Sequence, residues 1–390
     1  MTTSFPIHRR ASSTEWRIVA EKVLITGGAG FIGSHVVELL LAEGHDVVVY
    51  DALVEQVHRG AGPVNVPADA EFIHADVLDR DALQGALKGV DAVIHLAAEV
   101  GVGQSMYEIS RYVDANTGGT GVLLDIIANG HADVARIVVA SSMSIYGEGA
   151  YRCPDHGEVH PGLRSAAQLA ARDWDPACPV CGHPLQPVGT RESKPMLPTS
   201  VYAISKMDQE LLCHSVGAAY DIDVVALRYF NTYGPRQALS NPYTGVAAIF
   251  SSRLLNGRSP LAFEDGQQLR DFVHVRDIAR ATVAALGSSK AAGESINVGV
   301  GDPLTVTDVA VALSRSLGLD IEPAITKTAR AGDIRHCYAD MTKAAELLDF
   351  RPEVPFAEGI GELIEWVSAQ SADDHVDEAR AELVSRGLAR

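Results

Sequence analysis

The sequence lacks a hydrophobic run long enough to cross a membrane, because no apolar stretch reaches the roughly 18 residues that a spanning helix needs. Residues 1–20 contain His8, Arg9 and Arg10 but no apolar block after them, so the pattern of a secretory signal is missing. Cysteine is scarce, and the five cysteines are an odd number with uneven spacing, which does not fit a disulfide framework. We therefore expect a protein of the reducing cytoplasm.

Positive charge is also scarce. Lysine and arginine number 32 against 50 aspartate and glutamate residues, which leaves a net charge of -18. This balance argues against general nucleic-acid binding, which needs many cations to neutralise phosphates. A few local arginines can still hold one anionic ligand such as a diphosphate. The length of 390 residues favours two or three domains.

Short apolar runs alternate with helical patterns through the first 230 residues. The runs expected to form buried strands are 22–26, 46–51, 71–77, 91–97, 136–141 and 224–229. Such alternation predicts an α/β fold, a doubly wound parallel sheet of the Rossmann type with helices on both faces. After residue 235 the rhythm changes, and we expect helices at 246–255, 275–285, 306–317 and 343–348 and strands at 261–263 and 295–298.

These patterns divide the chain into four segments, the second of which contains an insert. We predict an N-terminal tail at 1–20, a Rossmann domain at 21–235, a smaller α/β substrate-binding lobe at 236–370 that interleaves with the last strands, and a C-terminal tail or helix at 371–390. Residues 148–198 interrupt the first domain with a segment of little periodicity. A structureless segment of this length is usually functional.

Three glycines, Gly27, Gly30 and Gly33, lie three residues apart between a predicted strand and a predicted helix. They allow a tight turn, the approach of a pyrophosphate and close packing of the helix. Asp51 ends the next strand, where a carboxylate accepts both ribose hydroxyls of NAD and repels the 2′-phosphate of NADP. The alternatives are a turn without function and a solvated acid. The residues predicted to bind NAD are Gly27, Gly30, Phe31, Ile32, Gly33, Asp51, Asp76, Val77, Leu96, Ala97, Ala98, Tyr202 and Lys206.

Tyr202 and Lys206 are the only tyrosine and lysine in the sequence with the spacing Tyr-x-x-x-Lys, which places both on one face of a helix. A tyrosine that acts as a base near neutrality needs its pKa lowered by about three units, or roughly 4 kcal/mol. A cation about 4–5 Å away supplies approximately that much at an effective dielectric of about 20. Ser142 ends a strand at the carboxyl edge of the sheet, where ligands of such folds bind. We predict Ser142, Tyr202 and Lys206 as catalytic residues of a hydride transfer; a surface helical pair and a turn cap are the alternatives.

Several motifs together resemble one enzyme family. They are Thr-Gly-Gly-Ala-Gly-Phe-Ile-Gly-Ser-His at 26–35, Ser142 four residues before Tyr146, Tyr202 with Lys206, Leu-Arg-Tyr-Phe-Asn at 227–231, Tyr-Gly-Pro-Arg at 233–236 and Arg-Asp-Phe-Val-His-Val at 270–275. Over about residues 20–365, apart from the insert, the chain resembles the extended short-chain dehydrogenases/reductases of the sugar-nucleotide epimerase/dehydratase group.

The resemblance implies a nucleoside-diphosphate sugar as substrate, with Asn231 near the diphosphate and Arg270 and Arg330 on its oxygens. Arginine suits this task because its fork binds phosphate oxygens in pairs. The alternative for each arginine is a surface charge. The substrate-binding residues expected from the resemblance are Ser142, Ser144, Asn231, Arg270 and Arg330. It also implies a homodimer formed through the helix before Asn129 and the helix that carries Tyr202.

The residues after Ser142 indicate the reaction. The 4,6-dehydratases of the family have an Asp-Glu pair there, whereas this chain has Met143 and Ser144, and a thioether cannot transfer protons. The resemblance then implies a nucleotide-sugar 4-epimerase with NAD as a regenerated cofactor. The insert and residues 263–267 look like those of a bacterial subgroup, the dTDP-L-rhamnose 4-epimerases. A 4-ketosugar reductase, a UDP-uronate decarboxylase, a dehydratase and a non-catalytic NAD-sensing relative are the alternatives.

The insert contains Cys153, His156, Cys178 and Cys181 in two C-x-x-[C/H] pairs. This spacing is typical of a tetrahedral zinc site with three cysteines and one histidine, in which four protein ligands leave no position for catalysis. His160 or His183 could replace His156. Reduced cysteines in a disordered loop, or a redox pair of Cys178 and Cys181, are the alternatives. The insert lies between Ser142 and Tyr202 in the sequence, so we expect it to cover or shape the sugar site.

Overall fold

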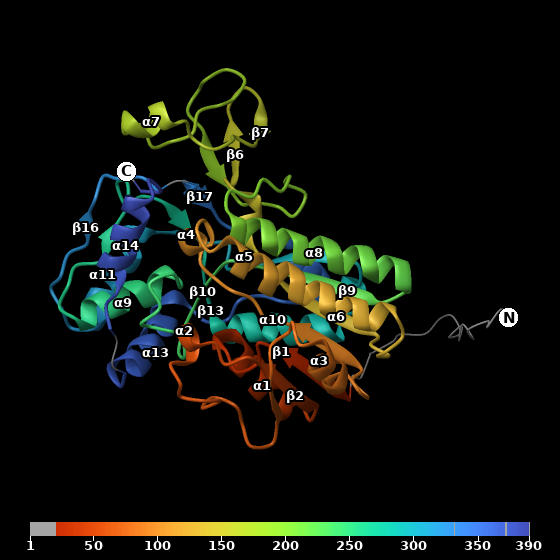
Figure 1. Ribbon diagram of the computed structural model, residues 1–390. Helices are drawn as coiled ribbons and strands as arrows, with labels where there is room; N and C mark the ends of the chain where they lie inside the picture. Colours follow the sequence, from red (N-terminus) through yellow and green to blue (C-terminus); the bar gives the residue numbers. More distant parts are fainter. Residues whose placement is uncertain (1–20, 331, 371–372, 390) are drawn as a thin grey trace.

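A seven-stranded parallel sheet forms the centre of the molecule in the computed structural model, which describes residues 21–330, 332–370 and 373–389 (Figure 1). Its order is β14-β9-β5-β4-β1-β2-β3, and all neighbours run parallel. The strands are β1 (Lys22–Thr26), β2 (Asp46–Asp51), β3 (Glu71–His74), β4 (Ala92–His95), β5 (Arg136–Ser142), β9 (Asp223–Tyr229) and β14 (Glu294–Val298). The strand order reverses between β1 and β4, which opens a ligand crevice at their carboxyl ends.

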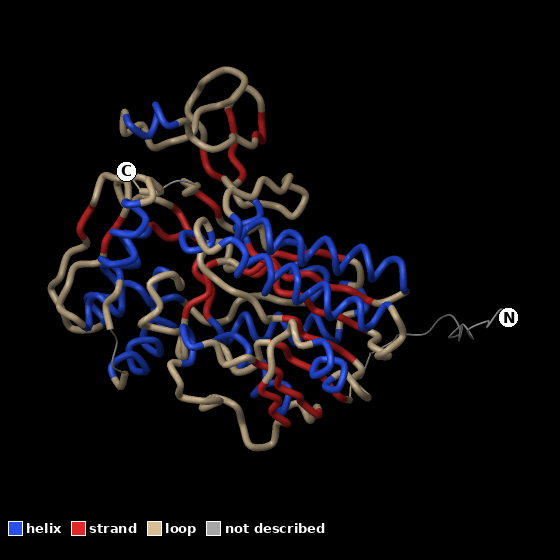
Figure 2. The backbone as a smooth tube through the Cα atoms, in the orientation of Figure 1, coloured by secondary structure: helices blue, strands red, loops and turns tan. Residues whose placement is uncertain are grey.

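Helices cover both faces of this sheet (Figure 2). Alternate residues of β1 point to opposite faces: Val23 and Ile25 join one apolar core, and Leu24 joins the other. The first core lies under α1 (Phe31–Ala42) and α10 (Val275–Gly287). The second core lies under α3 (Arg80–Ala86), α6 (Gly119–Ala128) and α8 (Val201–Tyr220). The predicted doubly wound Rossmann sheet is confirmed.

Residues after β9 build a smaller lobe around a third apolar core. Its main helices are α9 (Val246–Leu255), α11 (Val306–Ser316) and α13 (Phe356–Ser368). Short strands connect them: β10 (Asn231–Tyr233) with β13 (Phe272–His274), β11 (Leu261–Ala262) with β16 (Ala324–Ile325), and β12 (Leu269–Arg270) between β15 (Leu304–Thr305) and β17 (His336–Cys337). The helices α12 (Thr342–Leu348) and α14 (Val376–Ser385) follow. The expected tail at 1–20 lies outside the described residues, as do 371–372 and 390 of the expected terminal segment.

The insert projects from one end of the sheet (Figure 1). Contrary to the expectation of little regular structure, it contains a three-stranded antiparallel sheet, β7-β6-β8, of β6 (Ala150–Cys153), β7 (Gly157–Val159) and β8 (Gln186–Val188), with α7 (Ala166–Ala170) beside it. The two ends of the insert meet, because the Leu197 amide donates to the Ile145 carbonyl over 2.9 Å. Gly147 stands there with φ +64°, and a Cβ on it would lie 2.4 Å from the Leu197 oxygen.

Short helical turns complete the chain around the crevice. They are α2 (Glu55–His58), α4 (Val102–Ser105), α5 (Ile109–Tyr112), the π-helix η1 (Val113–Gly118) and the 3-10 turns η2 (Met143–Tyr146) and η3 (Ser289–Ala291). Across the described residues, every helix is too short or too polar to cross a membrane.

Candidate active site

One cavity of about 470 Å³ lies at the carboxyl ends of the sheet strands. It brings together 16 predicted residues: Gly27, Gly30, Phe31, Ile32, Gly33, Asp51, Asp76, Val77, Leu96, Ala97, Ala98, Ser142, Ser144, Tyr202, Lys206 and Asn231. These residues come from segments far apart in the sequence, and the parallel strands deliver them to one edge.

The glycine turn forms one wall of this cavity. Gly27 has φ +71°, and a Cβ there would lie 2.8 Å from the Ala97 nitrogen. A Cβ on Gly33 would lie 2.3 Å from the Gly27 oxygen, so this crossing of α1 over the turn needs glycine. Gly30 caps α1 without a side-chain hydrogen bond, which leaves the first amides of the helix free to bind an anion.

Asp51 is buried beside this turn at the end of β2. Its carboxylate accepts hydrogen bonds from the amides of Ala29, over 3.0 Å, and Leu53, over 2.9 Å. The His58 ring lies 3.6 Å from the same carboxylate. A carboxylate has about four lone-pair positions, so two amide donors leave room for a pair of hydroxyl groups. The glycine turn, the uncapped helix and this carboxylate together fit the diphosphate and ribose of a dinucleotide.

Ser142, Tyr202 and Lys206 line the same cavity. Ser142 ends β5, and its hydroxyl accepts hydrogen bonds from the Ser144 amide, over 3.2 Å, and the Ser144 hydroxyl, over 2.9 Å. Burial raises the pKa of Tyr202, and a hydrogen bond with Ser142 opposes that rise. The helix α8 that carries Tyr202 begins after Ser200, whose side chain accepts the Ala203 amide as an N-cap.

Lys206 is buried, with 3% of its surface exposed. Its ammonium donates to the Gln209 side-chain oxygen over 2.6 Å. Burial lowers the pKa of Lys206 to about 7, against the opposing influence of Cys213 and Glu210. Among the described residues, the Gln209 oxygen is the side-chain acceptor of the Lys206 ammonium, and burial leaves this charge poorly solvated one helical turn from Tyr202.

A buried polar network holds Gln209, and no motif in the sequence indicates it. The Gln209 amide nitrogen lies 2.8 Å from the Thr120 hydroxyl and 3.2 Å from His95. His95 also contacts the Thr26 hydroxyl over 2.7 Å, and burial lowers its pKa to about 3. The amide of Gln209 thus donates into the network, which turns its oxygen toward Lys206.

Arg270 and Arg330 are absent from the described lining of the cavity. Arg270 donates to the backbone oxygens of Ile334, over 2.7 Å, and Arg335, over 2.9 Å. Arg330 donates twice to Asp333, over 3.0 and 3.1 Å, and stacks on the Phe263 ring. Their role at a diphosphate stays a prediction, and both contact the segment around Asp333.

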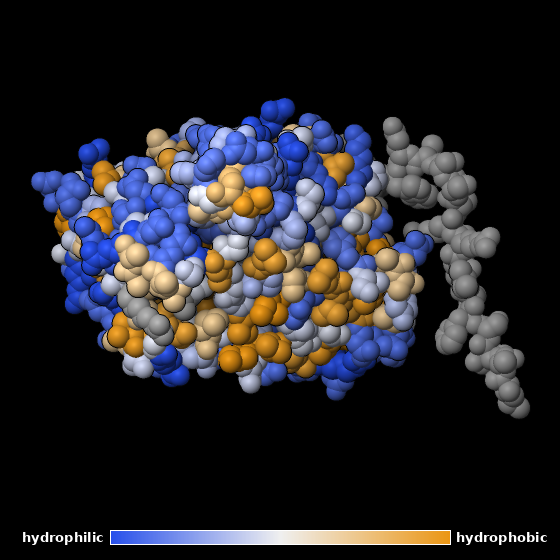
Figure 3. Space-filling view, turned by 90° about the horizontal axis from the view of Figure 1, so that it is seen from above, coloured by the Kyte–Doolittle hydropathy of each residue, from blue (hydrophilic) through white to orange (hydrophobic). Residues whose placement is uncertain are grey.

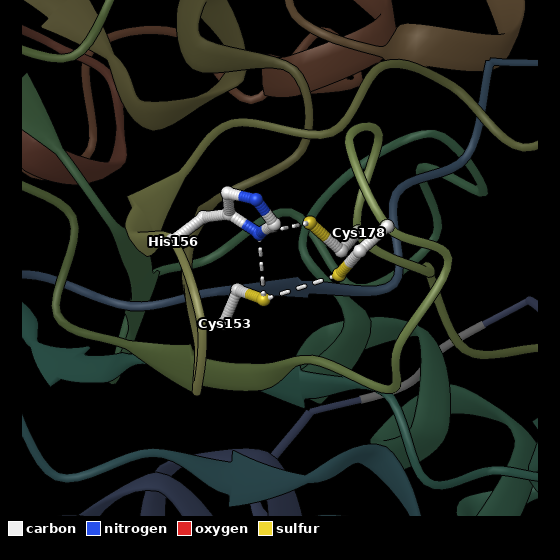
Figure 4. A group of neighbouring side chains, drawn as sticks. Cys153, His156 and Cys178 are labelled. Carbon is white, nitrogen blue, oxygen red and sulfur yellow. Dashed lines mark hydrogen bonds between the residues drawn. The ribbon is translucent and has the colours of Figure 1, made fainter.

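The insert places Cys153, His156, Cys178 and Cys181 around one point, with ligand atoms within 4.8 Å of one another (Figure 4). The Cys153 sulfur lies 3.5 Å from His156 Nδ1 and 3.6 Å from the Cys181 sulfur. The Cys178 sulfur lies 3.8 Å from the same nitrogen. The two other candidate histidines face acids, since His160 contacts Glu158 and His183 contacts Asp155.

Comparison with known proteins assigns the chain to a family. The profile of the NAD dependent epimerase/dehydratase family matches residues 23–165 and 178–299, which is more than half of the chain. The chain belongs to this family. The segment that the profile leaves unmatched, between residues 165 and 178, lies in the middle of the insert.

Curated relatives of this family member match nearly the whole chain. A dTDP-L-rhamnose 4-epimerase of Burkholderia thailandensis is 37% identical over 353 residues, covering 90% of this chain and 96% of the relative. A UDP-glucose 4-epimerase of Mycolicibacterium smegmatis is 33% identical, with 90% and 99% covered. The solved structure of a Thermus thermophilus UDP-glucose 4-epimerase with NAD is 31% identical, has a TM-score of 0.70, and covers 89% of this chain and 99% of its own.

The cavity also has polar lining residues that sequence reasoning missed, among them Gln56, Asn241 and Tyr243. Gln56 donates to both Gln104 and Asn241 over 3.0 Å, which joins the region after β2 to the loop before α9. The Tyr107 and Tyr243 hydroxyls lie 2.5 Å apart nearby. Each of these residues stands alone in its stretch of sequence, so no motif could have indicated it.

The insert does not cover this cavity as we expected, since none of its described residues, 148–198, lines it. The insert packs instead against the C-terminal lobe, where the Thr190 amide donates to the Tyr338 carbonyl over 2.8 Å. The chain turns toward β17 at the start of the insert, where the Gly149 amide donates to the His336 carbonyl over 2.9 Å, so the added residues lie beside the C-terminal lobe.

Proposed function

We propose that this protein is an NAD-dependent epimerase that inverts C4 of a nucleoside-diphosphate hexose. The observation that carries the proposal is the meeting of Ser142, Tyr202 and Lys206 with the glycine turn and Asp51 in one cavity. Solved relatives of similar fold include a UDP-glucose 4-epimerase of Thermotoga maritima with UDP-glucose, at 30% identity and a TM-score of 0.72. NAD, bound at the glycine turn, would accept the C4 hydride and return it.

Tyr202 is the proposed base for the C4 hydroxyl of the sugar. The Lys206 charge would favour the tyrosinate, because an opposite charge nearby stabilises the ionised form of a phenol. Once the hydroxyl proton has moved to Tyr202, C4 can lose its hydride and become a ketone. Tyr202 then returns the proton to the oxygen when hydride adds to the opposite face of C4.

Ser142 is the proposed anchor of the reacting oxygen. Its hydroxyl already accepts two hydrogen bonds from Ser144, so its own proton can be donated to the sugar oxygen. Such a donor stabilises the oxygen as charge develops on it during proton removal. Ser144 therefore has a supporting role, in which it orients the Ser142 hydroxyl.

The site favours epimerisation over dehydration. Elimination of water from C5 and C6 needs an acid and a base next to the catalytic hydroxyl residue. Met143 and Ser144 occupy the positions that follow Ser142, and neither side chain is an acid or base near neutral pH. We therefore propose that the 4-ketone is reduced again without loss of water.

For the substrate we propose dTDP-L-rhamnose or a hexose with the same nucleotide. The support is the 37% identity to the Burkholderia thailandensis enzyme and the resemblance of the insert to that subgroup. Asn231, which lines the cavity, is the proposed contact to the sugar diphosphate. Arg270 and Arg330, which contact the segment 333–335, are proposed for the diphosphate oxygens.

We also propose a cytoplasmic homodimer that carries zinc. Large hydrophobic side chains are exposed on α5, η1 and α8, namely Ile109, Val113, Ile204 and Leu211. Figure 3 shows hydrophobic side chains gathered to one side of the insert, on the face seen from above. An apolar surface of this kind favours pairing of two copies through these helices.

Zinc is proposed for the cluster of three cysteines and His156 in the insert.

Product analysis tests the proposed reaction. The purified protein is incubated in D₂O with a panel of dTDP- and UDP-hexoses without added reductant, and product sugars are identified by NMR. We expect a C4 epimer, no net formation of NADH and no deuterium at C5, with no product from Tyr202→Phe. Stoichiometric NADH, or a 4-keto-6-deoxy product carrying solvent deuterium, would move the protein to the dehydrogenase or dehydratase branch.

A further inference from the structure

The cysteine and histidine cluster has the dimensions of a zinc site. Tetrahedral zinc, with bonds of about 2.3 Å to sulfur and about 2.0–2.1 Å to nitrogen, places two sulfurs about 3.8 Å apart and a sulfur and a nitrogen about 3.6 Å apart. The corresponding distances here are 3.6 Å between Cys153 and Cys181, and 3.5 and 3.8 Å from His156 to Cys153 and Cys178. Figure 4 shows the ring nitrogen and the sulfurs converging on one point.

The loop between the two ligand pairs has little apolar core of its own. Of residues 157–177, only Pro161, Arg164 and Pro176 are buried, and α7 within it buries none. A segment with so little buried surface does not offset the entropy of ordering it. A metal bound by His156 on one side and Cys178 on the other closes this loop and fixes its two ends.

The same loop contacts the C-terminal lobe through charged groups. Arg164 lies 2.8 Å from Glu264 and donates to the Asp333 backbone oxygen over 3.1 Å. Asp175 accepts a hydrogen bond from Arg335 over 2.8 Å. Arg335 also contacts Glu264 over 3.2 Å.

The charges of this contact are buried, so their geometry matters. Glu264 is fully buried, and Arg335 is only 3% exposed. Removing one partner of a buried ion pair leaves the other charge without solvent or compensation. Arg335 is also held by the Asp265 carboxylate, over 2.6 and 2.9 Å. The position of Arg164, which the loop carries, therefore bears mainly on the compensation of Glu264 and on the backbone at Asp333.

The segment 333–336 is held between this contact and Arg270. On one side lie Arg164 and Asp175 of the insert, together with Glu148, which accepts the Arg335 and His336 amides. On the other side, Arg270 donates to the backbone oxygens of residues 334 and 335. The hydrogen bonds from Arg270 hold the segment 333–336, and the same bonds hold the Arg270 guanidinium in place. A displacement of this segment therefore moves the guanidinium.

We infer that Zn²⁺ bound by Cys153, His156, Cys178 and Cys181 orders the 157–177 loop as a clamp on segment 333–336, and so positions Arg270 for the substrate diphosphate. The part that concerns substrate rests on the proposed function. Zinc here is structural, since four protein ligands leave no open position.

Metal content and hydrogen exchange test the clamp. The protein, expressed in zinc-supplemented medium, is assayed by mass spectrometry of metals for wild type, Cys178→Ser/Cys181→Ser and the control Cys213→Ser, whose cysteine lies in the sheet core. We expect one zinc per chain in wild type and control, and near none in the double variant. Amide exchange in residues 333–340 should accelerate in the double variant, while β1, β4 and β5 keep their protection.

Arg164→Gln separates the clamp from the metal, with exposed Arg172→Gln of the same loop as its control. We expect Arg164→Gln to keep its zinc but lose protection at 333–340, and calorimetry with dTDP and UDP to show binding weakened about tenfold, with NAD binding unchanged. A wild type without zinc, or zinc-free protein with unaltered exchange and nucleotide binding, would overturn the inference. If no hexose is converted while exchange still responds to zinc, the clamp stands and only the proposed reaction falls.

Discussion

Burial of Lys206 should make the folded protein less stable at every pH at which the unfolded chain still carries the lysine proton, up to about pH 10.5. The unfolded chain holds this proton up to about pH 10.5, whereas the pKa of the folded-state group is about 7. Between these values the unfolded state binds more protons, so the stability of the wild type rises with pH in this window. Lys206→Met removes the titrating group with a side chain of similar length, so we expect a gain in stability at low pH.

The magnitude follows from the width of the window. A difference of about 3.5 pKa units corresponds to about 5 kcal/mol at pH 6 and below. By pH 9 the same relation leaves about 2 kcal/mol. Loss of the 2.6 Å bond to Gln209 leaves its oxygen without a partner, which costs about 1–3 kcal/mol. We therefore expect Lys206→Met to gain roughly 2–4 kcal/mol at pH 6 and about nothing at pH 9.

Thermal unfolding between pH 6 and pH 9 measures this difference. With about 2.1 cal/mol/K of unfolding entropy per residue, a gain of about 3 kcal/mol raises Tm by about 4 °C in a chain of 390 residues. NAD content is matched between samples, and exposed Lys88→Met is the control. If Lys206→Met has a lower Tm than wild type at pH 6, or changes Tm equally at pH 6 and pH 9, then the buried ammonium does not destabilise the folded protein as expected.

Three further substitutions test the site. Tyr202→Phe should lower kcat by about 10²–10⁴-fold while NAD binding, measured by calorimetry, stays unchanged. Asp51→Asn should lower the affinity for NAD roughly tenfold or more. It should also reduce the preference for NAD over NADP, because the charge that repels the 2′-phosphate is gone. An unchanged ratio of NAD to NADP affinity in the variant would contradict this role of Asp51. Gly33→Ala places a Cβ 2.3 Å from the Gly27 oxygen, so both Tm and NAD affinity should fall, whereas Gly85→Ala, with open space around it, should leave both intact.

The central strands of the sheet could be predicted because they are buried on both faces. Continuous apolar runs that end in glycine or acid fixed β1 and β2 at their observed bounds. The runs at 71–77 and 91–97 extend beyond the ladder, whose strands end at His74 and His95. Their remaining residues leave the sheet to line the cavity, so apolar character alone could not separate strand from site.

The site could be predicted where several residues share one motif. The glycine turn and the Tyr202 and Lys206 pair have a spacing that a single local element imposes. Gln209 and His95 carry no such spacing, because they lie 114 residues apart and meet only when α8 packs on the folded sheet. Three-residue strands such as β7 are too short to display alternation, which is why the insert looked irregular.

The meeting of the two ends of the insert has an evolutionary consequence. Because Ile145 and Leu197 already pair across its base, the roughly fifty residues between them form a closed side branch. A shorter turn could bridge the same two points without shifting β5 or α8, and so without moving the hydroxyls of Ser142 and Tyr202, the proposed catalytic groups on either side. An insert at this junction can be gained, lost or replaced during evolution while the cavity keeps its residues, because insertions are best tolerated where the two chain ends already lie together.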